Sequence, residues 1–127
     1  MKRILLILTV TAAMMLAACG VPRAAGTLAA QYAASATTLP QDDAAVRQQL
    51  AAEDAAWTNL SQLLRQHAFG GITGVDPGFV QLIDQTAALA KRQHELITEN
   101  QDDPALNRQA LQRFNGLWQS TNTYLNQ

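Results

Sequence analysis

The stretch VDPGFV, residues 75–80, carries a strong signal for the start of a helix. The carboxylate of Asp76 can accept hydrogen bonds from the unpaired amides of a first helical turn. Pro77 suits the first helical position because it has no amide hydrogen to leave unpaired. The same Asp-Pro pair recurs at residues 103–104. Two helices are therefore predicted to begin at residues 77 and 104.

A third helix is predicted upstream of these two. Pro40 opens it, and Asp42 and Asp43 fall in its first turn, where the helix dipole favours negative charge. Gly70 and Gly71 end it, and the short links between the helices make consecutive helices antiparallel neighbours. The expected helices cover approximately residues 40–68, 77–100 and 104–126.

Each of the three segments repeats apolar residues at spacings of three and four, which is typical of the buried face of a bundle helix. The first has Val46, Leu50, Trp57, Leu60 and Leu64; the second has Phe79, Leu82, Leu89 and Leu96, flanked by Ile83, Ala90 and Ile97; the third has Leu111, Phe114, Trp118 and Leu125. A cofactor pocket lined by aromatic residues is the alternative, but such stripes are far more often core. The pattern predicts an all-α fold, a small up-down-up three-helix bundle over residues 40–127.

The N-terminus has the composition of a secretory signal peptide, expected to cover residues 1–18. Lys2 and Arg3 are followed by an uncharged run over residues 4–16 and then by two alanines. The run is too short for a membrane-spanning helix, which needs roughly 17–25 residues. This composition therefore predicts that the protein is exported from the cytoplasm.

The tetrapeptide LAAC, residues 16–19, resembles the lipobox of bacterial lipoproteins. The resemblance implies cleavage between Ala18 and Cys19, a diacylglycerol thioether on the Cys19 sulfur, and an acyl chain such as palmitate on the new N-terminus. Gly20 and Val21 stand where an inner-membrane lipoprotein has Asp, which by the same resemblance implies the outer membrane, facing the periplasm. The alternative is an ordinary signal peptide with an incidental cysteine. Cys19 is the only cysteine, so no disulfide or second thiolate is expected.

Residues 19–39 are interpreted as a lipidated N-terminus and flexible tether that lifts the domain off the membrane. Pro22 and Gly26 break the early part, and an Ala-rich helix over residues 28–36 would be shorter than helices that persist alone in water. The alternative is a fourth helix that packs on the bundle through Leu28 and Tyr32.

The charge pattern argues against nucleic acid as a partner. Without Lys2 and Arg3, seven basic and ten acidic side chains remain, a net charge of −3. Phosphate backbones require a basic stripe, and the sequence has none.

Glu53 occupies a seam position of the first helix, and an antiparallel register places Arg92, Gln93 and His94 near it. We expect a structural polar layer in which Glu53 meets one or more of these residues and fixes the register. A proton-linked or ligand-binding role is the alternative. His67 and His94 fall at opposite ends of the same hairpin, about 25 Å apart by helical rise, so no shared metal site is expected.

No catalytic arrangement is expected, and the protein is interpreted as a non-enzyme without a cofactor. The carboxylates at residues 42–43, 76 and 102–103 all lie at helix starts, where capping accounts for them. No serine has the glycine-rich elbow or the His–acid partners of a hydrolase.

The leading hypothesis is a lipid-anchored interaction or accessory module that docks an envelope or periplasmic protein. In general architecture it resembles secretion pilotins, conjugation entry-exclusion lipoproteins and immunity lipoproteins. Phe69, Ile72 and Val75 are the expected contact surface. The alternatives are a structural lipoprotein that self-associates and a carrier of a small ligand in the bundle core.

Mass spectrometry of protein purified from membranes tests the predicted anchor. The expected mass is that of a chain beginning at Cys19 and carrying diacylglycerol and acyl groups. An unmodified cysteine, or a leader still attached, would overturn the lipoprotein interpretation.

Overall fold

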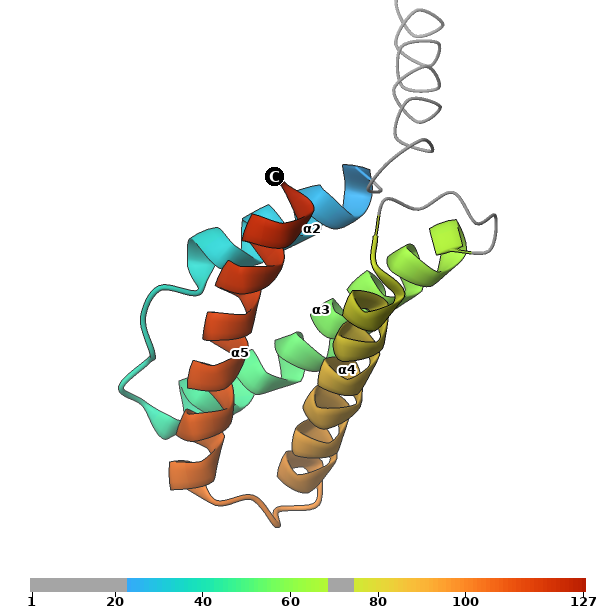
Figure 1. The fold of residues 1–127 in the computed structure, drawn as a ribbon. Coiled ribbons are helices and arrows are strands. Elements are labelled where there is room, and N and C mark those ends of the chain that lie inside the picture. Colours follow the sequence, from blue (N-terminus) through green and yellow to red (C-terminus); the bar gives the residue numbers. More distant parts are fainter. Residues whose placement is uncertain (1–22, 69–74) are drawn as a thin grey trace, which may run out of the picture.

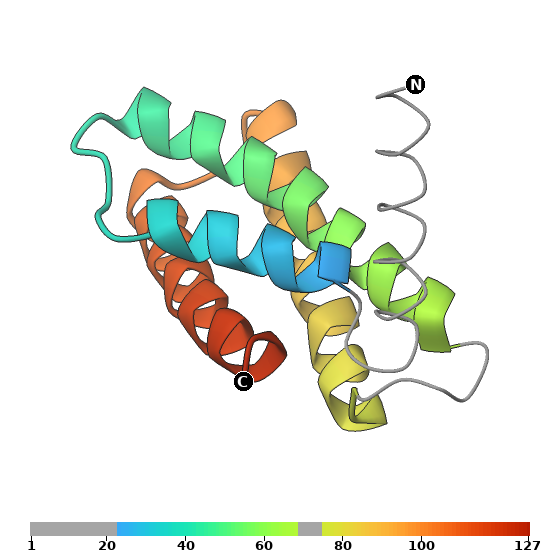
Figure 2. The ribbon, with the colours of Figure 1, turned by 90° about the horizontal axis from the view of Figure 1, so that it is seen from above.

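A computed structural model describes residues 23–68 and 75–127, and these residues form four helices and no strand. The helices are α2 (Arg23–Ser35), α3 (Asp43–Ala68), α4 (Pro77–Thr98) and α5 (Pro104–Leu125). α3 and α4 pack as an antiparallel pair, and α2 packs chiefly on α5 (Figures 1 and 2). Although α4 and α5 are consecutive, their backbones approach each other at few positions. The all-α class is therefore confirmed, with a different arrangement from the one expected.

The expected count of three helices is wrong because residues 23–35, interpreted as tether, form the packed helix α2. Its inner face is made of small residues that are buried against the core, including Ala25, Ala29 and Ala33. Tyr32 stacks on Trp118 of α5 with ring centroids 4.7 Å apart. A short Ala-rich helix is marginal only in isolation, and here tertiary packing stabilises it. The alternative of a fourth helix is the one that the structure supports.

Hydrogen bonds from α5 hold α2 near both of its ends. Asn126 Nδ2 donates to the Gly26 carbonyl over 3.0 Å, and a Cβ at Gly26 would lie only 2.7 Å from the Asn126 side-chain oxygen. Gln119 Nε2 donates to the Ala33 carbonyl over 2.7 Å. The glycine that seemed to break the segment therefore permits close approach to α5.

The two helix starts predicted from the Asp-Pro pairs are confirmed, whereas the start predicted at Pro40 is wrong: α3 begins at Asp43, and the Asp42 side chain accepts from the Ala44 amide. Asp76 and Asp103 are the N-caps of α4 and α5, and each side chain accepts from an amide two residues later, with a proline at the first helical position. At the other end of α4, Asn100 has a left-handed φ of 55°. Its amide donates to Ile97 O and the next amide donates to Leu96 O, the pair of bonds that closes a Schellman turn.

The predicted buried stripes of α3 and α5 are confirmed at every position, but the stripe of α4 is rotated. Ile83, Thr86 and Ala90 are buried, whereas Leu82 and Leu89 are 46% and 51% exposed. Small Ala90 lets α4 lie close to α3, and Thr86 can be buried because its hydroxyl donates to Leu82 O over 2.8 Å. Because Thr86 is polar, a search for repeated apolar residues does not identify this face of α4 as the buried one.

Substituting Leu60→Ala and Leu89→Ala separates the two kinds of position. Leu60 is fully buried, so its truncation leaves a cavity and should lower the free energy of unfolding by about 3 kcal/mol. Leu89→Ala should change it by less than about 0.5 kcal/mol, since half of that side chain is already in water. Urea unfolding followed by circular dichroism measures both. Equal losses would contradict the observed rotation of α4.

Candidate functional site

The centre of the molecule combines a buried carboxylate with a stack of aromatic rings. Glu53 on α3 is 6% exposed, and its Oε2 accepts a hydrogen bond from Trp118 Nε1 over 2.7 Å. Trp118 lies between two other rings, with centroids 3.7 Å from Trp57 and 4.7 Å from Tyr32. The cluster thus joins α2, α3 and α5 at one point.

Burial raises the pKa of the Glu53 carboxyl, because desolvation penalises its charged form. The Trp118 N–H opposes this by donating a hydrogen bond that stabilises the carboxylate. Trp57 Nε1 is itself buried and forms no hydrogen bond in the part of the chain that the structure describes. Desolvation is the largest of these effects, so the pKa of Glu53 stays above its usual value.

The predicted pairing of Glu53 with Arg92, Gln93 or His94 is wrong. Glu53 points to α5, and its neighbour Asp54 faces α4 instead, where its Oδ2 lies 2.8 Å from His94 Nδ1.

The other two residues of the expected layer also have different partners. Arg92 forms an ion pair with Glu95 on its own helix, at 3.6 Å. Gln93 Nε2 donates to Asn107 of α5. The predicted register correctly placed residues 53–54 of α3 near residue 94 of α4. However, Asp54 is the acid that faces α4, and Glu53, one residue earlier, faces α5.

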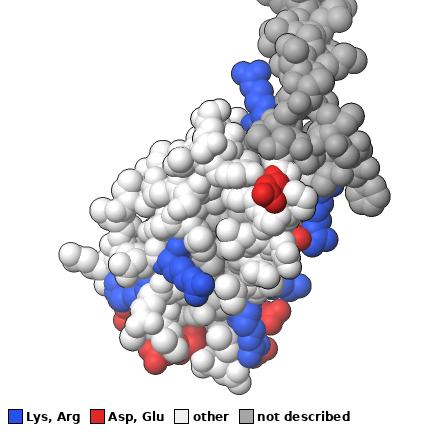
Figure 3. Space-filling model, viewed as in Figure 1, with Lys and Arg blue, Asp and Glu red and all other residues white. Residues whose placement is uncertain are grey.

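Ion pairs account for further charged side chains. Arg65 of α3 binds Asp84 of α4 through two nitrogens, with Nη2 2.7 Å from Oδ2, and Ser61 donates to the same carboxylate. The Arg65 hydrogen bond, helped by Ser61, lowers the pKa of Asp84. Arg108 of α5 pairs with Asp43 at 2.6 Å. On the face shown in Figure 3, charged side chains gather toward the lower end, and much of the upper part is uncharged.

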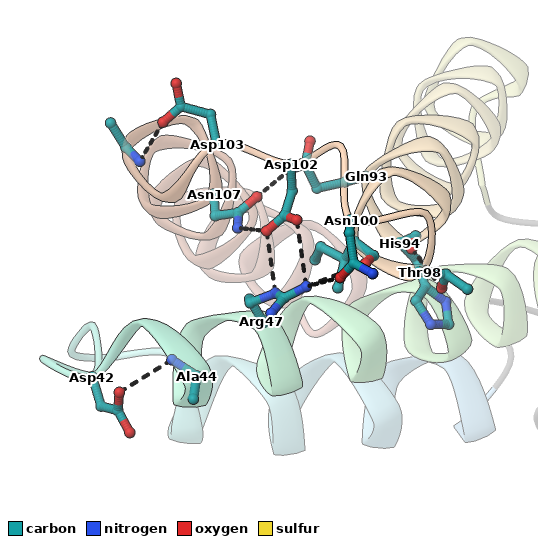
Figure 4. A network of polar contacts seen from close by, with 12 residues as sticks. Asp42, Ala44, Arg47, Gln93, His94, Thr98, Asn100, Asp102, Asp103 and Asn107 are labelled. Atoms are coloured by element: carbon teal, nitrogen blue, oxygen red, sulfur yellow. Dashed lines mark hydrogen bonds and ion pairs between the residues drawn. The ribbon is translucent and has the colours of Figure 1, made fainter.

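A second polar network fixes the turn between α4 and α5 to α3 (Figure 4). Arg47 Nη2 donates to Ile97 O over 3.2 Å, and Arg47 Nε lies 3.2 Å from Asp102 Oδ2. Asn107, which is 1% exposed, donates to Asp102 over 2.7 Å. The hydrogen bond from Asn107 is the largest effect that lowers the pKa of Asp102; a backbone hydrogen bond and the charge of Arg47 act in the same direction.

Sequence reasoning missed this network, although one signal was present. Asn107 stands four residues before Leu111, in line with the buried stripe of α5, so its position indicated burial. A buried amide requires hydrogen-bond partners, and the acids of the adjacent turn are the nearest candidates.

Several predicted site residues do not form the expected surface. Val75 is 5% exposed, so its assignment to an exposed contact surface is wrong: it is buried against the core beside the start of α4. Cys19, Phe69 and Ile72 lie outside the described residues, as do residues 1–18, for which a signal peptide is predicted. Among the described residues, no group of three potential ligands could hold a metal ion. None of the described helices combines the length and apolar character needed to cross a bilayer.

The exposed large apolar side chains of the described residues are Leu82 and Leu89 on α4 and Leu106 on α5. The two leucines of α4 stand seven residues apart and so share one side of the helix. Gln93, on the same edge of α4, reaches Asn107, which places that edge toward α5. At the other end, Phe79 stacks on Tyr124 with centroids 4.0 Å apart. Leu82 and Leu89 thus lie between two points where α4 and α5 meet.

The comparisons with known proteins find no match: no family model fits the chain, and neither curated proteins nor solved structures match it.

Replacing Glu53 by Gln tests the buried carboxyl. The pKa of Glu53 in the folded protein is raised above 4.5, so its stabilising contribution is complete below that pH and is lost as the pH rises through the folded value. We expect Glu53→Gln to be more stable than the wild type at pH 7, by a margin that shrinks toward pH 5. Urea unfolding at each pH measures that difference.

The difference between the two proteins isolates Glu53 from groups that titrate in both. The lowered pKa values of Asp84 and Asp102 affect stability only below about 3.8, outside this range. Glu99→Gln, at an exposed site, is the matched control and should leave the profile unchanged. A margin independent of pH would contradict the role given to burial.

Proposed function

We propose that this chain is a lipid-anchored, non-catalytic interaction module of the bacterial envelope. In this proposal Cys19 carries the lipid, and the leucine row of α4, defined as Leu82, Leu89 and Leu96, docks an amphipathic helix of an envelope protein. The module would serve as an accessory to secretion, conjugation exclusion or immunity. The observation that carries the proposal is the exposure of Leu82 and Leu89 on a helix whose opposite face is already buried.

The spacing of the leucine row favours a helical partner. Leu82, Leu89 and Leu96 recur every seven residues, the repeat by which two helices keep a continuous seam. Burial of a leucine side chain contributes roughly 1.5–3 kcal/mol. A partner helix with its own apolar row would bury the two exposed leucines, Leu82 and Leu89.

The roles of the acidic side chains support a non-catalytic function. Asp76 and Asp103 cap helices, and Asp43, Asp84 and Asp102 are held in ion pairs. Each therefore has a structural task that explains its presence. Glu53, the most buried acid among the described residues, accepts a hydrogen bond from Trp118 of the aromatic stack.

Site-specific photo-crosslinking in the cells that carry the gene tests the docking surface. A photoreactive residue at Gln85, which is exposed between the two leucines, should give one discrete adduct. Mass spectrometry should map the adduct to a helix of an envelope protein with apolar residues seven apart. The same probe at Gln48, exposed on α3, is the matched control and should give none.

The double variant Leu82→Ser, Leu89→Ser should lose the Gln85 adduct while its thermal unfolding stays close to that of the wild type, because both side chains are half exposed. An adduct to a second copy of this chain would support self-association instead. An adduct to lipid alone, or none from a folded and anchored protein, would also overturn the proposal.

A further inference from the structure

We propose that the end of the domain formed by the start of α2 and the end of α5 lies directly against a phospholipid bilayer. The domain would then have a fixed orientation on the membrane instead of being lifted from it. This inference depends on the proposed lipid anchor at Cys19.

The length of chain between the anchor and the fold is the first argument. α2 begins at Arg23, four residues after Cys19. Four residues span at most about 14 Å when fully extended. The first turn of α2 cannot easily unwind to lengthen this link, because Ala25 is fully buried and the Gly26 carbonyl accepts a hydrogen bond from Asn126. A lipid on Cys19 therefore brings this end of the domain to the membrane surface.

The distribution of charge is the second argument. We divide the described residues into an anchor half, residues 23–41, 55–68, 75–90 and 114–127, and a distal half, residues 42–54 and 91–113. The anchor half has two basic and two acidic side chains and is neutral. The distal half has five basic and eight acidic side chains, so the net charge of −3 resides there.

Electrostatics favours the orientation that the short link imposes. Residue 54 lies roughly 20 Å along α3 from the end of that helix, by helical rise. This exceeds the Debye length of about 8 Å at physiological ionic strength, so an anionic bilayer would be screened from most of the distal acids. The opposite orientation would turn the half that has the net charge of −3 toward the lipid phosphates.

The exposed surface of the anchor half has a chemistry that suits lipid headgroups. No residue of 114–127 is charged, and its exposed side chains include Ser120, Thr123 and Gln127, which can form hydrogen bonds. Arg23, at the start of α2, is exposed and basic. Figure 3 shows the contrast between the largely uncharged upper part and the charged lower end.

Energy transfer to lipid headgroups tests this orientation. The lipidated protein is placed in vesicles of phosphatidylethanolamine and phosphatidylglycerol that contain a headgroup acceptor dye. A donor is attached at Thr123→Cys near the end of α5 or at Gln101→Cys in the turn after α4; both positions are exposed. They are roughly 30 Å apart along α5 by helical rise. We expect at least threefold stronger quenching at position 123 than at 101.

A matched variant with twelve Gly and Ser residues inserted between Gly20 and Val21 should bring the two quenching values closer together. Equal quenching at both positions in the protein with the natural link, or stronger quenching at 101, would overturn the orientation. Failure of the proposed anchor has a different signature, because an unlipidated chain would not float with the vesicles at all.

Discussion

The hydrogen bond from Trp118 to Glu53 is the contact on which the arrangement of helices depends. It joins α3 to α5 in the middle of both helices, and the stack of Tyr32, Trp118 and Trp57 extends the same contact to α2. A bundle this small has little apolar core to spare, so one central cluster that touches three helices matters more than it would in a larger domain. The hydrogen bond from Trp118 offsets part of the cost of burying the Glu53 carboxylate, and it also fixes the position of the Trp118 ring.

The sequence predicted those parts of the fold that local chemistry determines. The Asp-Pro starts of α4 and α5, and the apolar stripes of α3 and α5, follow from capping and helical period alone. The packing of α2 did not, because an Ala-rich segment has little apolar contrast and depends on a partner surface. α4 has one face rich in leucine and another with Ile83, Thr86 and Ala90. The second face is the one buried against α3, because its small side chains allow close packing. The partner of Glu53 likewise depended on a one-residue difference in register.

The rotation of α4 connects the fold to the proposed function. Had Leu82 and Leu89 entered the core, α4 would not present this pair of leucines to a partner. Instead, Ile83, Thr86 and Ala90 pack against α3, and Leu82 and Leu89 stay exposed, where another helix can bind them. The same preference for small residues at a helix contact brings α2 onto α5, so small side chains shape both pairs of helices.

The two proposals together restrict the kind of partner that can reach the leucine row. α4 begins at the anchor half of the domain, so Leu82 lies about 8 Å and Leu96 about 28 Å along the helix from its start. With the anchor half against the bilayer, a docked helix would lie within a few helical turns of the headgroups and would run away from the membrane plane alongside α4. A protein free in the periplasm would lose translational freedom to bind there, whereas a protein held in the same membrane is already concentrated at that height. The geometry therefore favours a partner whose amphipathic helix immediately follows or precedes its own membrane attachment.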